Sequence, residues 1–191
     1  KQIKEQVLAK TDQYPLAKIG DLNTAVNNAY REICALKRWW FLESSATFNT
    51  SAYTTLAGTS ERVYGLPDDF KDMISVRFGT TWLEPLSITN YDLFLSAQTT
   101  TGTPNHYTIY GLSANLQKEL YIVPPAGSHD TVTLRYWRRI TDLSADADEP
   151  WIDEDYHRLI ILGVIDEAMP FGEVRGLVRQ EYQDGIAAMI G

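Results

Sequence analysis

Apolar residues recur at helical spacing near the start of the chain. They are Leu22, Val26, Ala29, Ile33, Leu36 and Trp40. Spacings that alternate between four and three place them on one helix face, and Asp21 before them suits an N-cap. We therefore predict one helix from Asp21 to about residue 42, roughly 33 Å long at 1.5 Å per residue. A stripe of this length needs a partner to cover it. A shorter helical stripe, with Ile3, Val7 and Leu8, precedes it.

Two further helices are predicted at the end of the chain. Asp153 or a neighbour caps a helix that runs to about Met169, because Pro170 stops it. The last helix begins near Gly172 and carries apolar residues on one side. These are Val174, Leu177, Val178, Tyr182 and Ile186. The short connection predicts a helical hairpin.

The middle of the chain is typical of short strands separated by turns. Stretches rich in β-branched and aromatic residues predict strands near 46–48, 62–66, 73–78, 82–88, 107–110, 119–123 and 131–139. In the last stretch, Val132, Leu134 and Tyr136 alternate with other residues and form one face. Pro67-Asp68-Asp69 predicts a turn, and Thr89 is expected to cap a short helix.

The order helices, strands, helices predicts an α+β protein. We expect the terminal helices to form a helical bundle with an antiparallel β-sandwich-like domain inserted between them. The expected parts are 1–44 for the N-terminal helices, 45–140 for the β domain and 141–191 for the C-terminal helices.

Composition and charge narrow the class of protein. The 191 residues are 44% hydrophobic and 22% charged, as in an ordinary globular protein. Seventeen Lys and Arg against 25 Asp and Glu leave a net charge of -8, which repels nucleic acid and anionic membranes. No apolar run is long enough to span a bilayer, and no secretory leader is visible. The single cysteine, Cys34, excludes an intramolecular disulfide.

The sequence lacks the usual patterns of an active site or a metal site. It has no G-x-S-x-G elbow, no phosphate-binding glycine loop and no zinc spacing, so we expect no enzyme activity, no cofactor and no metal. The acidic stretch from Asp142 to Glu149 lacks the glycine of a calcium loop and is interpreted as a solvated linker.

Apolar runs that no single helix face can bury are more informative. Trp39 to Leu42 and Leu159 to Leu162 would point in every direction around a helix. Such runs either fill junctions within the chain or meet another subunit. The candidate interface residues are Trp39, Trp40, Phe41, Leu42, Tyr136, Trp137, Arg138, Arg139, Leu159 and Ile161.

Several motifs in sequence extend this picture. After Trp39-Trp40-Phe41-Leu42 come stretches 64–70 (YGLPDDF), 102–107 (GTPNHY), 120–126 (LYIVPPA) and 133–139 (TLRYWRR), and then Leu143-Ser144 before Glu149-Pro150. In this order the chain resembles the head-to-tail adaptor (connector) proteins of tailed bacteriophages, including the tail-tubular type of short-tailed phages.

The resemblance implies a non-enzymatic structural protein of the virion neck, assembled in the host cytoplasm. Such adaptors form a homo-oligomeric ring, commonly of twelve copies, that joins the portal to the tail or its nozzle protein. Their helical bundle surrounds a channel through which DNA passes without sequence-specific binding.

An acidic channel would suit that role, because it repels phosphates. The acidic candidates on the terminal helices are Glu32, Asp166, Glu167, Glu173, Glu181 and Asp184. An ordinary solvated helix face explains the same residues.

Two other functions remain open at this point. A carbohydrate-binding β module would stack sugars on exposed aromatic residues, for which Tyr107, Tyr110 and Trp82 are candidates. A hydrolase would use Asp68, Asp69 or one of the three histidines, His106, His129 and His157.

Overall fold

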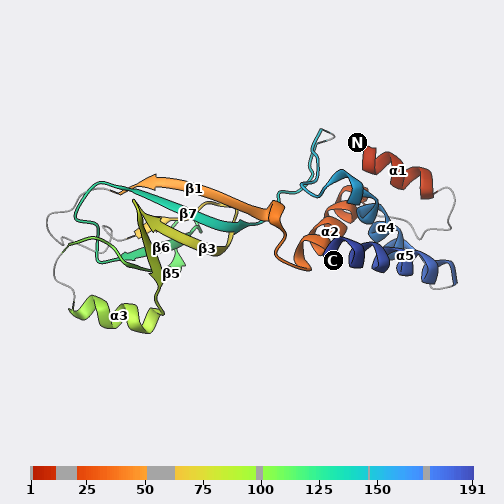
Figure 1. Cartoon of the computed structure of the whole chain (residues 1–191). Helices are drawn as coiled ribbons and strands as arrows, with labels where there is room; N and C mark the ends of the chain where they lie inside the picture. The colour runs from red at the N-terminus through yellow and green to blue at the C-terminus, as the bar shows by residue number, and fades with distance from the viewer. Residues whose placement is uncertain (1, 12–20, 51–62, 98–100, 146, 170–172) are drawn as a thin grey trace. The chain divides into compact units, whose positions relative to one another are not determined.

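The computed structural model describes residues 2–11, 21–50, 63–97, 101–145, 147–169 and 173–191 (Figure 1). The chain divides into two compact units. One comprises Lys1–Phe41 with Ile140–Gly191, and the other comprises Leu42–Arg139. The prediction of a mixed α+β protein whose terminal helices pack together is confirmed.

The first unit is helical. It contains α1 (Gln2–Thr11), α2 (Leu22–Ala35), the 3₁₀ turn η3 (Glu154–Tyr156), α4 (His157–Ala168) and α5 (Glu173–Ile190). Helix α4 packs against α1, α2 and α5. This explains the apolar run in α4, where Leu159, Ile160, Ile161, Leu162, Val164 and Ile165 are all buried. A helix surrounded by three others can be apolar on nearly every side.

Helix α2 begins as predicted and ends earlier. The side chain of Asp21 accepts hydrogen bonds from the Asn23 amide at 3.0 Å and the Thr24 hydroxyl at 2.6 Å, which confirms the N-cap. The prediction of a helix to about residue 42 is wrong, because α2 ends at Ala35. The Ile33 carbonyl accepts from the Leu36 amide and from the indole N–H of Trp39, so the regular helical pattern is not continued. Only the short 3₁₀ turn η1 (Trp40–Leu42) follows.

In its described residues, the second unit consists of one sheet and one helix. Its strands are β1 (Glu43–Asn49), β2 (Val63–Gly65), β3 (Phe70–Phe78), β4 (Thr81–Pro85), β5 (His106–Leu112), β6 (Lys118–Val123) and β7 (Thr131–Arg138), with α3 (Ile88–Ala97) after β4. Among the described residues the seven strands follow the order β1-β7-β3-β4-β5-β6-β2. Phe48 of β1 and Tyr64 of β2, from the two ends of this order, stack with ring centroids 4.6 Å apart. The sheet is therefore curled like a half-barrel.

Four details of the β prediction need correction. The sheet is continuous rather than a sandwich of two antiparallel sheets, and β4 and β5 pair in parallel. Helix α3 connects these two strands, as a parallel pair requires a crossover connection. The segment predicted as strand 82–88 ends at Pro85, and Ser87, not Thr89, accepts from the first turn of α3 through the Asn90 amide.

The remaining sequence pattern matches the sheet closely. Val132, Leu134 and Tyr136 form the buried face of β7, as their alternation predicts. They belong to one core with Leu66, Phe70, Val76, Phe78, Leu83, Tyr107, Leu120, Ile122 and Ala126. The Phe70 amide donates to the Pro67 carbonyl, which confirms the turn at Pro67-Asp68-Asp69. The polar, glycine-containing stretch from Thr99 to Thr103 is typical of a loop, and its first two residues lie outside the described residues.

Candidate functional site

The run Trp39 to Leu42 presents only one of its four side chains to solvent. Trp39 is buried, donates its indole N–H to the Ile33 carbonyl at 2.9 Å and stacks on Phe41. Phe41 and Leu42 are also buried, whereas Trp40 is 73% exposed. The interface candidate that this run offers to a partner is therefore Trp40.

The other predicted interface residues are mostly covered by the chain itself. Leu159 and Ile161 lie in the core of the helical unit. Tyr136 is buried in the sheet, and its hydroxyl donates to Asp69 at 2.9 Å. Burial raises the pKa of Tyr136. On the same strand Trp137 and Arg138 are half-buried, and Arg139 just beyond it is exposed.

Helix α5 exposes part of its predicted apolar stripe. Of the five stripe residues only Val178 is buried, and Tyr182 and Ile186 are half-buried. Val174 and Leu177, one turn apart, are exposed, Leu177 to 69%. Leu177 and Trp40 are the two most exposed large apolar side chains of the helical unit's described residues. The period in the sequence predicts which residues share one side of the helix, but it does not reveal how much of that side a partner helix covers.

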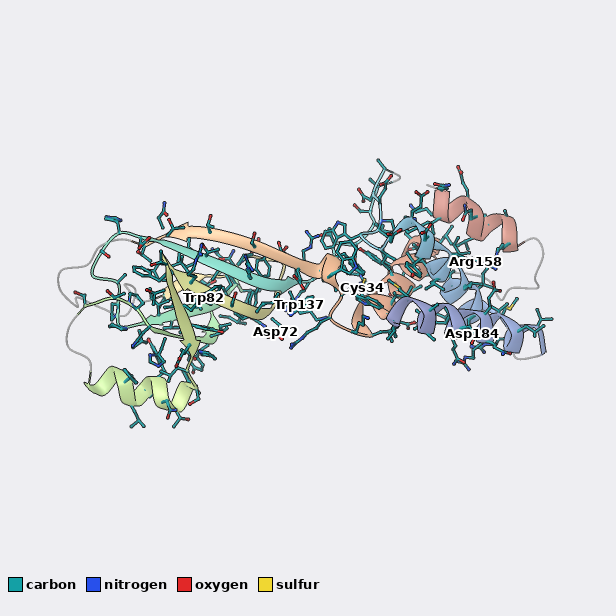
Figure 2. All side chains as sticks on the ribbon, viewed as in Figure 1. Cys34, Asp72, Trp82, Trp137, Arg158 and Asp184 are labelled. Atoms are coloured by element: carbon teal, nitrogen blue, oxygen red, sulfur yellow. The ribbon has the colours of Figure 1, made fainter. Side chains whose placement is uncertain are left out.

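The acidic candidates fall into two groups. Glu32, Glu167 and Asp184 are exposed (Asp184 is labelled on α5 in Figure 2). Asp166 is mostly buried and binds the Nε atoms of Arg175 at 3.2 Å and Arg179 at 3.5 Å. Glu181 of α5 forms an ion pair with Arg158 of α4. The side chain of Glu173 lies outside the described residues.

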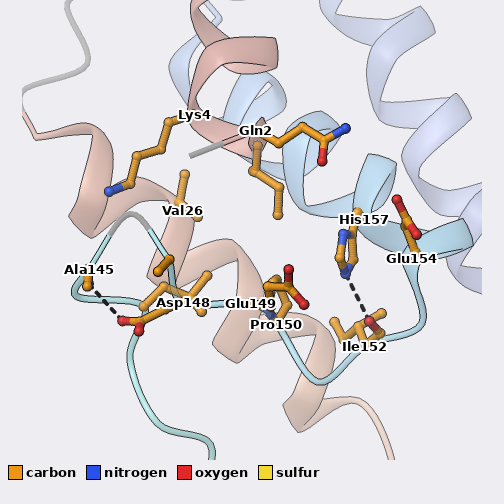
Figure 3. A pocket seen from close by; sticks show the side chains of 13 residues that line it. Gln2, Lys4, Val26, Ala145, Asp148, Glu149, Pro150, Ile152, Glu154 and His157 are labelled. Atoms are coloured by element: carbon orange, nitrogen blue, oxygen red, sulfur yellow. Dashed lines mark hydrogen bonds between the residues drawn. The ribbon is translucent and has the colours of Figure 1, made fainter.

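A groove lies in the helical unit between the first turn of α1 and the linker that precedes α4 (Figure 3). Its volume is about 400 Å³. Ile3, Val26, Leu143 and Ile152 supply apolar lining. Figure 3 shows Lys4 and Asp148 towards one end, Glu154 and His157 towards the other, and Glu149 between them.

The groove residues are held by local hydrogen bonds. One carboxylate oxygen of Asp148 accepts from the backbone amides of Ser144 and Ala145, both at 2.7 Å. Hydrogen bonds from these two amides lower the pKa of Asp148, and the Ala145 amide has the larger effect. His157 places Nε2 2.9 Å from the Ile152 carbonyl oxygen. The described residues of the acidic linker thus form one wall of the groove. The part of the chain that the structure describes holds no cluster of three or more metal-ligating side chains.

Of the three residues considered for sugar binding, two are exposed and one is buried. Tyr107 is only 8% exposed and belongs to the sheet core, so its prediction as an exposed aromatic is wrong. Trp82 is 59% exposed and lies beside the Arg77 guanidinium, 5.9 Å from the ring centroid. Tyr110 is exposed and lies beside Tyr121, with ring centroids 6.5 Å apart.

The residues considered for hydrolysis have structural partners. Asp68 accepts from the side-chain amide of Gln117 at 2.7 Å, and Asp69 accepts from Tyr136. Nδ1 of His129 lies 2.7 Å from the Thr50 carbonyl oxygen. His106 lies beside Asn105, with Nδ1 2.8 Å from the side-chain oxygen. These contacts account for the carboxylates and histidines as parts of turns and strand ends.

Comparison with known proteins gives one family. The model of the family described as SU10 adaptor protein matches residues 1–191. A search of curated proteins finds no match. Among the described helices, none has both the length and the apolar composition that crossing a membrane requires.

Proposed function

Since this chain belongs to the SU10 adaptor protein family of phage head–tail adaptors, we propose that its copies form a closed ring between portal and tail. The family is one of structural adaptors rather than enzymes, and it implies a location in the virion. In the proposed ring, one side binds the portal protein and the other binds the tail or its nozzle protein. The DNA channel runs through the centre.

The exposure of Trp40 and Leu177 carries the proposal. Both are large apolar side chains on the surface of a unit built from the two ends of the chain. Covering such surface by a second copy is favourable, and aromatic residues are enriched at interfaces. A contact between two different surfaces of the same protein closes into a ring when its rotation allows. Twelve copies, the number common among the adaptors that the chain resembles, is our expectation.

The exposed carboxylates support the proposed channel. Glu32, Glu167 and Asp184 lie on three helices of the helical unit. If they face the centre of the ring, they repel phosphates and leave DNA free to slide. We assign a lesser part to Asp166 and Glu181, because their charges are already paired with arginines.

We assign the predicted bundle (1–44 and 141–191) to the helical unit and the predicted β domain (45–140) to the sheet unit, in which β1 already begins at Glu43. In this assignment the bundle surrounds the channel and the β domain extends outward or towards the tail. The exposed residues Leu112 and Leu116 near the hairpin between β5 and β6 are candidates for the tail-side contact.

The test uses particles of the phage that encodes the chain. Mass spectrometry of purified virions and electron microscopy of their necks measure the presence, copy number and arrangement of the protein. We expect a ring at the head–tail junction. In parallel, Trp40→Ala with Leu177→Ser should lower ring yield, whereas Trp82→Ala, an exposed tryptophan of the other unit, should not. A protein absent from virions, or present there without cyclic arrangement, contradicts the proposal.

A further inference from the structure

The groove of the helical unit combines an apolar lining with acidic walls. Val26, Leu143 and Ile152 are buried side chains along it. Three carboxylates, of Asp148, Glu149 and Glu154, line it against one lysine, Lys4. Its volume of about 400 Å³ lies within the range of pockets that bind ligands, roughly 300–1,000 Å³. An occupant should therefore carry an apolar anchor and positive charge.

A segment of the same unit has that composition. Directly after α2, residues 36–40 read Leu-Lys-Arg-Trp-Trp. Leu36, Lys37, Arg38 and Trp40 are exposed, and Trp39 is the buried member that holds the segment to the Ile33 carbonyl. Lys37 also donates to the carbonyl oxygen of Ile190 at 2.9 Å, which ties the segment to the end of α5. The segment 36–40 thus presents two apolar and two basic side chains from a fixed base.

The segment does not occupy the groove of its own copy. Trp40 would be buried there, yet it is 73% exposed. Val26, in the groove, and Leu36 are ten residues apart, about 15 Å along a helix. The two surfaces are therefore separate patches of one unit.

We propose that the segment 36–40 of one copy docks in the groove of the next copy around the ring. The inference rests on the proposed ring and names its subunit contact. Trp40 and Leu36 supply the apolar anchor, and Lys37 and Arg38 face Glu149 and Glu154. A contact between two different patches is head-to-tail, the type that closes into rings. The same carboxylates disfavour DNA as an occupant, because they repel phosphates.

Reversal of charge on each side tests the contact. The groove variant carries Glu149→Lys and Glu154→Lys, which leaves Asp148 and its hydrogen bonds in place. The segment variant carries Lys37→Glu and Arg38→Glu. Each variant alone should lose at least about tenfold in ring yield, because like charges then meet at every contact. Mass photometry and negative-stain microscopy measure the yield, and circular dichroism checks folding.

Mixing the two variants gives the decisive result. In an alternating ring, the acidic segment of one variant meets the basic groove of the other, and the basic segment of the second meets the acidic groove of the first. Every contact is complementary again, so equal mixtures should recover even-numbered rings. The double reversal Glu167→Lys with Asp184→Lys is the matched control and should leave ring yield unchanged.

The outcomes separate this contact from the proposed function. If rings survive both charge reversals, the proposed contact is wrong although the ring stands, and this is the result expected if a different protein fills the groove. If mixing the two variants fails to restore rings, the contact is also wrong. Trp40→Ala provides a second measure without a change of charge, and an unchanged ring yield for it also overturns the contact. A wild-type protein without rings in virions overturns the proposed function first, and the contact with it.

Discussion

Asn27 and Leu143 are joined by a pair of buried hydrogen bonds. The side-chain amide of Asn27 donates to the Leu143 carbonyl at 3.2 Å, and the Leu143 amide donates to the Asn27 side-chain oxygen at 2.8 Å. Nearby along α2, the hydroxyl of Tyr30 accepts from the Trp151 amide at 2.9 Å. Side chains of α2 therefore provide hydrogen-bond partners for backbone groups of the linker before α4. That linker lines the groove.

Replacement of Asn27 by alanine should destabilise the helical unit. It leaves the buried amide and carbonyl of Leu143 without these partners, at a cost of about 1–3 kcal/mol. Asn23→Ala is the matched control, because Asn23 is an exposed residue of the same helix. Urea unfolding followed by circular dichroism measures both. Equal stabilities of the two variants would contradict the structural role of Asn27.

The neighbours Asp166 and Glu167 should respond differently to the same change. Asp166 is mostly buried between Arg175 and Arg179, so Asp166→Ala removes one charge-assisted hydrogen bond and one ion pair and should cost about 1–3 kcal/mol. Glu167 is exposed, and Glu167→Ala should change the free energy of unfolding by less than about 0.5 kcal/mol. Thermal and urea unfolding measure the difference. A Glu167→Ala variant as unstable as Asp166→Ala would show that burial is not the cause.

The glycines of α4 and α5 provide a test of helix packing. A Cβ on Gly163 would lie 3.2 Å from the Cβ of Ala29, which cannot move without its helix, whereas a Cβ on Gly176 meets nothing within 4 Å. Gly176→Ala should therefore stabilise the protein by about 0.5–1 kcal/mol, the usual helix preference for alanine. Gly163→Ala should fall short of that gain by about 1 kcal/mol or more. Melting temperatures that rise equally in both variants would show that α2 and α4 are less closely packed than described.

Much of the secondary structure could be predicted from local pattern, and the exceptions have physical causes. The alternation in β7 and the cap at Asp21 depend on neighbouring residues, and both are as predicted. The apolar period of α2 continues in the sequence through Leu36 and Trp40. The helix nevertheless ends at Ala35, because the indole N–H of Trp39 donates a hydrogen bond to the Ile33 carbonyl. A period in the sequence carries no information about such a bond.

The groove could not be predicted, because its parts lie far apart in the chain. Its lining combines the first turn of α1, Val26 of α2 and the linker before α4. The hydrogen-bonded pair that holds this linker to α2, Asn27 and Leu143, is separated by 116 positions in the sequence. For the run Trp39 to Leu42, the sequence pattern indicated surplus apolar surface but did not show which side chain is exposed. In the fold the other three side chains are buried, and Trp40 is the exposed one.

Asp148 should make the stability of the linker depend on pH. Its pKa is lowered in the folded protein by the Ala145 and Ser144 amides, so the ionised form is favoured by folding. The contribution is therefore present above the ordinary carboxyl pKa, near 3.8, and is lost as the pH falls through the lower folded value. Asp148→Ala should melt below the wild type at pH 7, with a gap that narrows as the pH falls below about 4. A gap that is constant from pH 7 to pH 3 would rule out the carboxylate charge as the cause.

The acidic channel makes a prediction about DNA that stability measurements cannot address. Wild-type rings should bind duplex DNA weakly, because Glu32, Glu167 and Asp184 repel phosphates in the proposed channel. Changing all three to lysine should leave ring yield unchanged and produce DNA binding that weakens steeply with salt.

The matched control places the same three changes on exposed carboxylates of the β unit, namely Glu43, Glu84 and Asp92. Fluorescence anisotropy against salt measures affinity, and titration at saturation measures stoichiometry. If the three residues face the channel, saturation should occur at one duplex per ring, since a single channel admits one duplex. Several duplexes per ring, as an outer surface would bind, would place these carboxylates outside the channel.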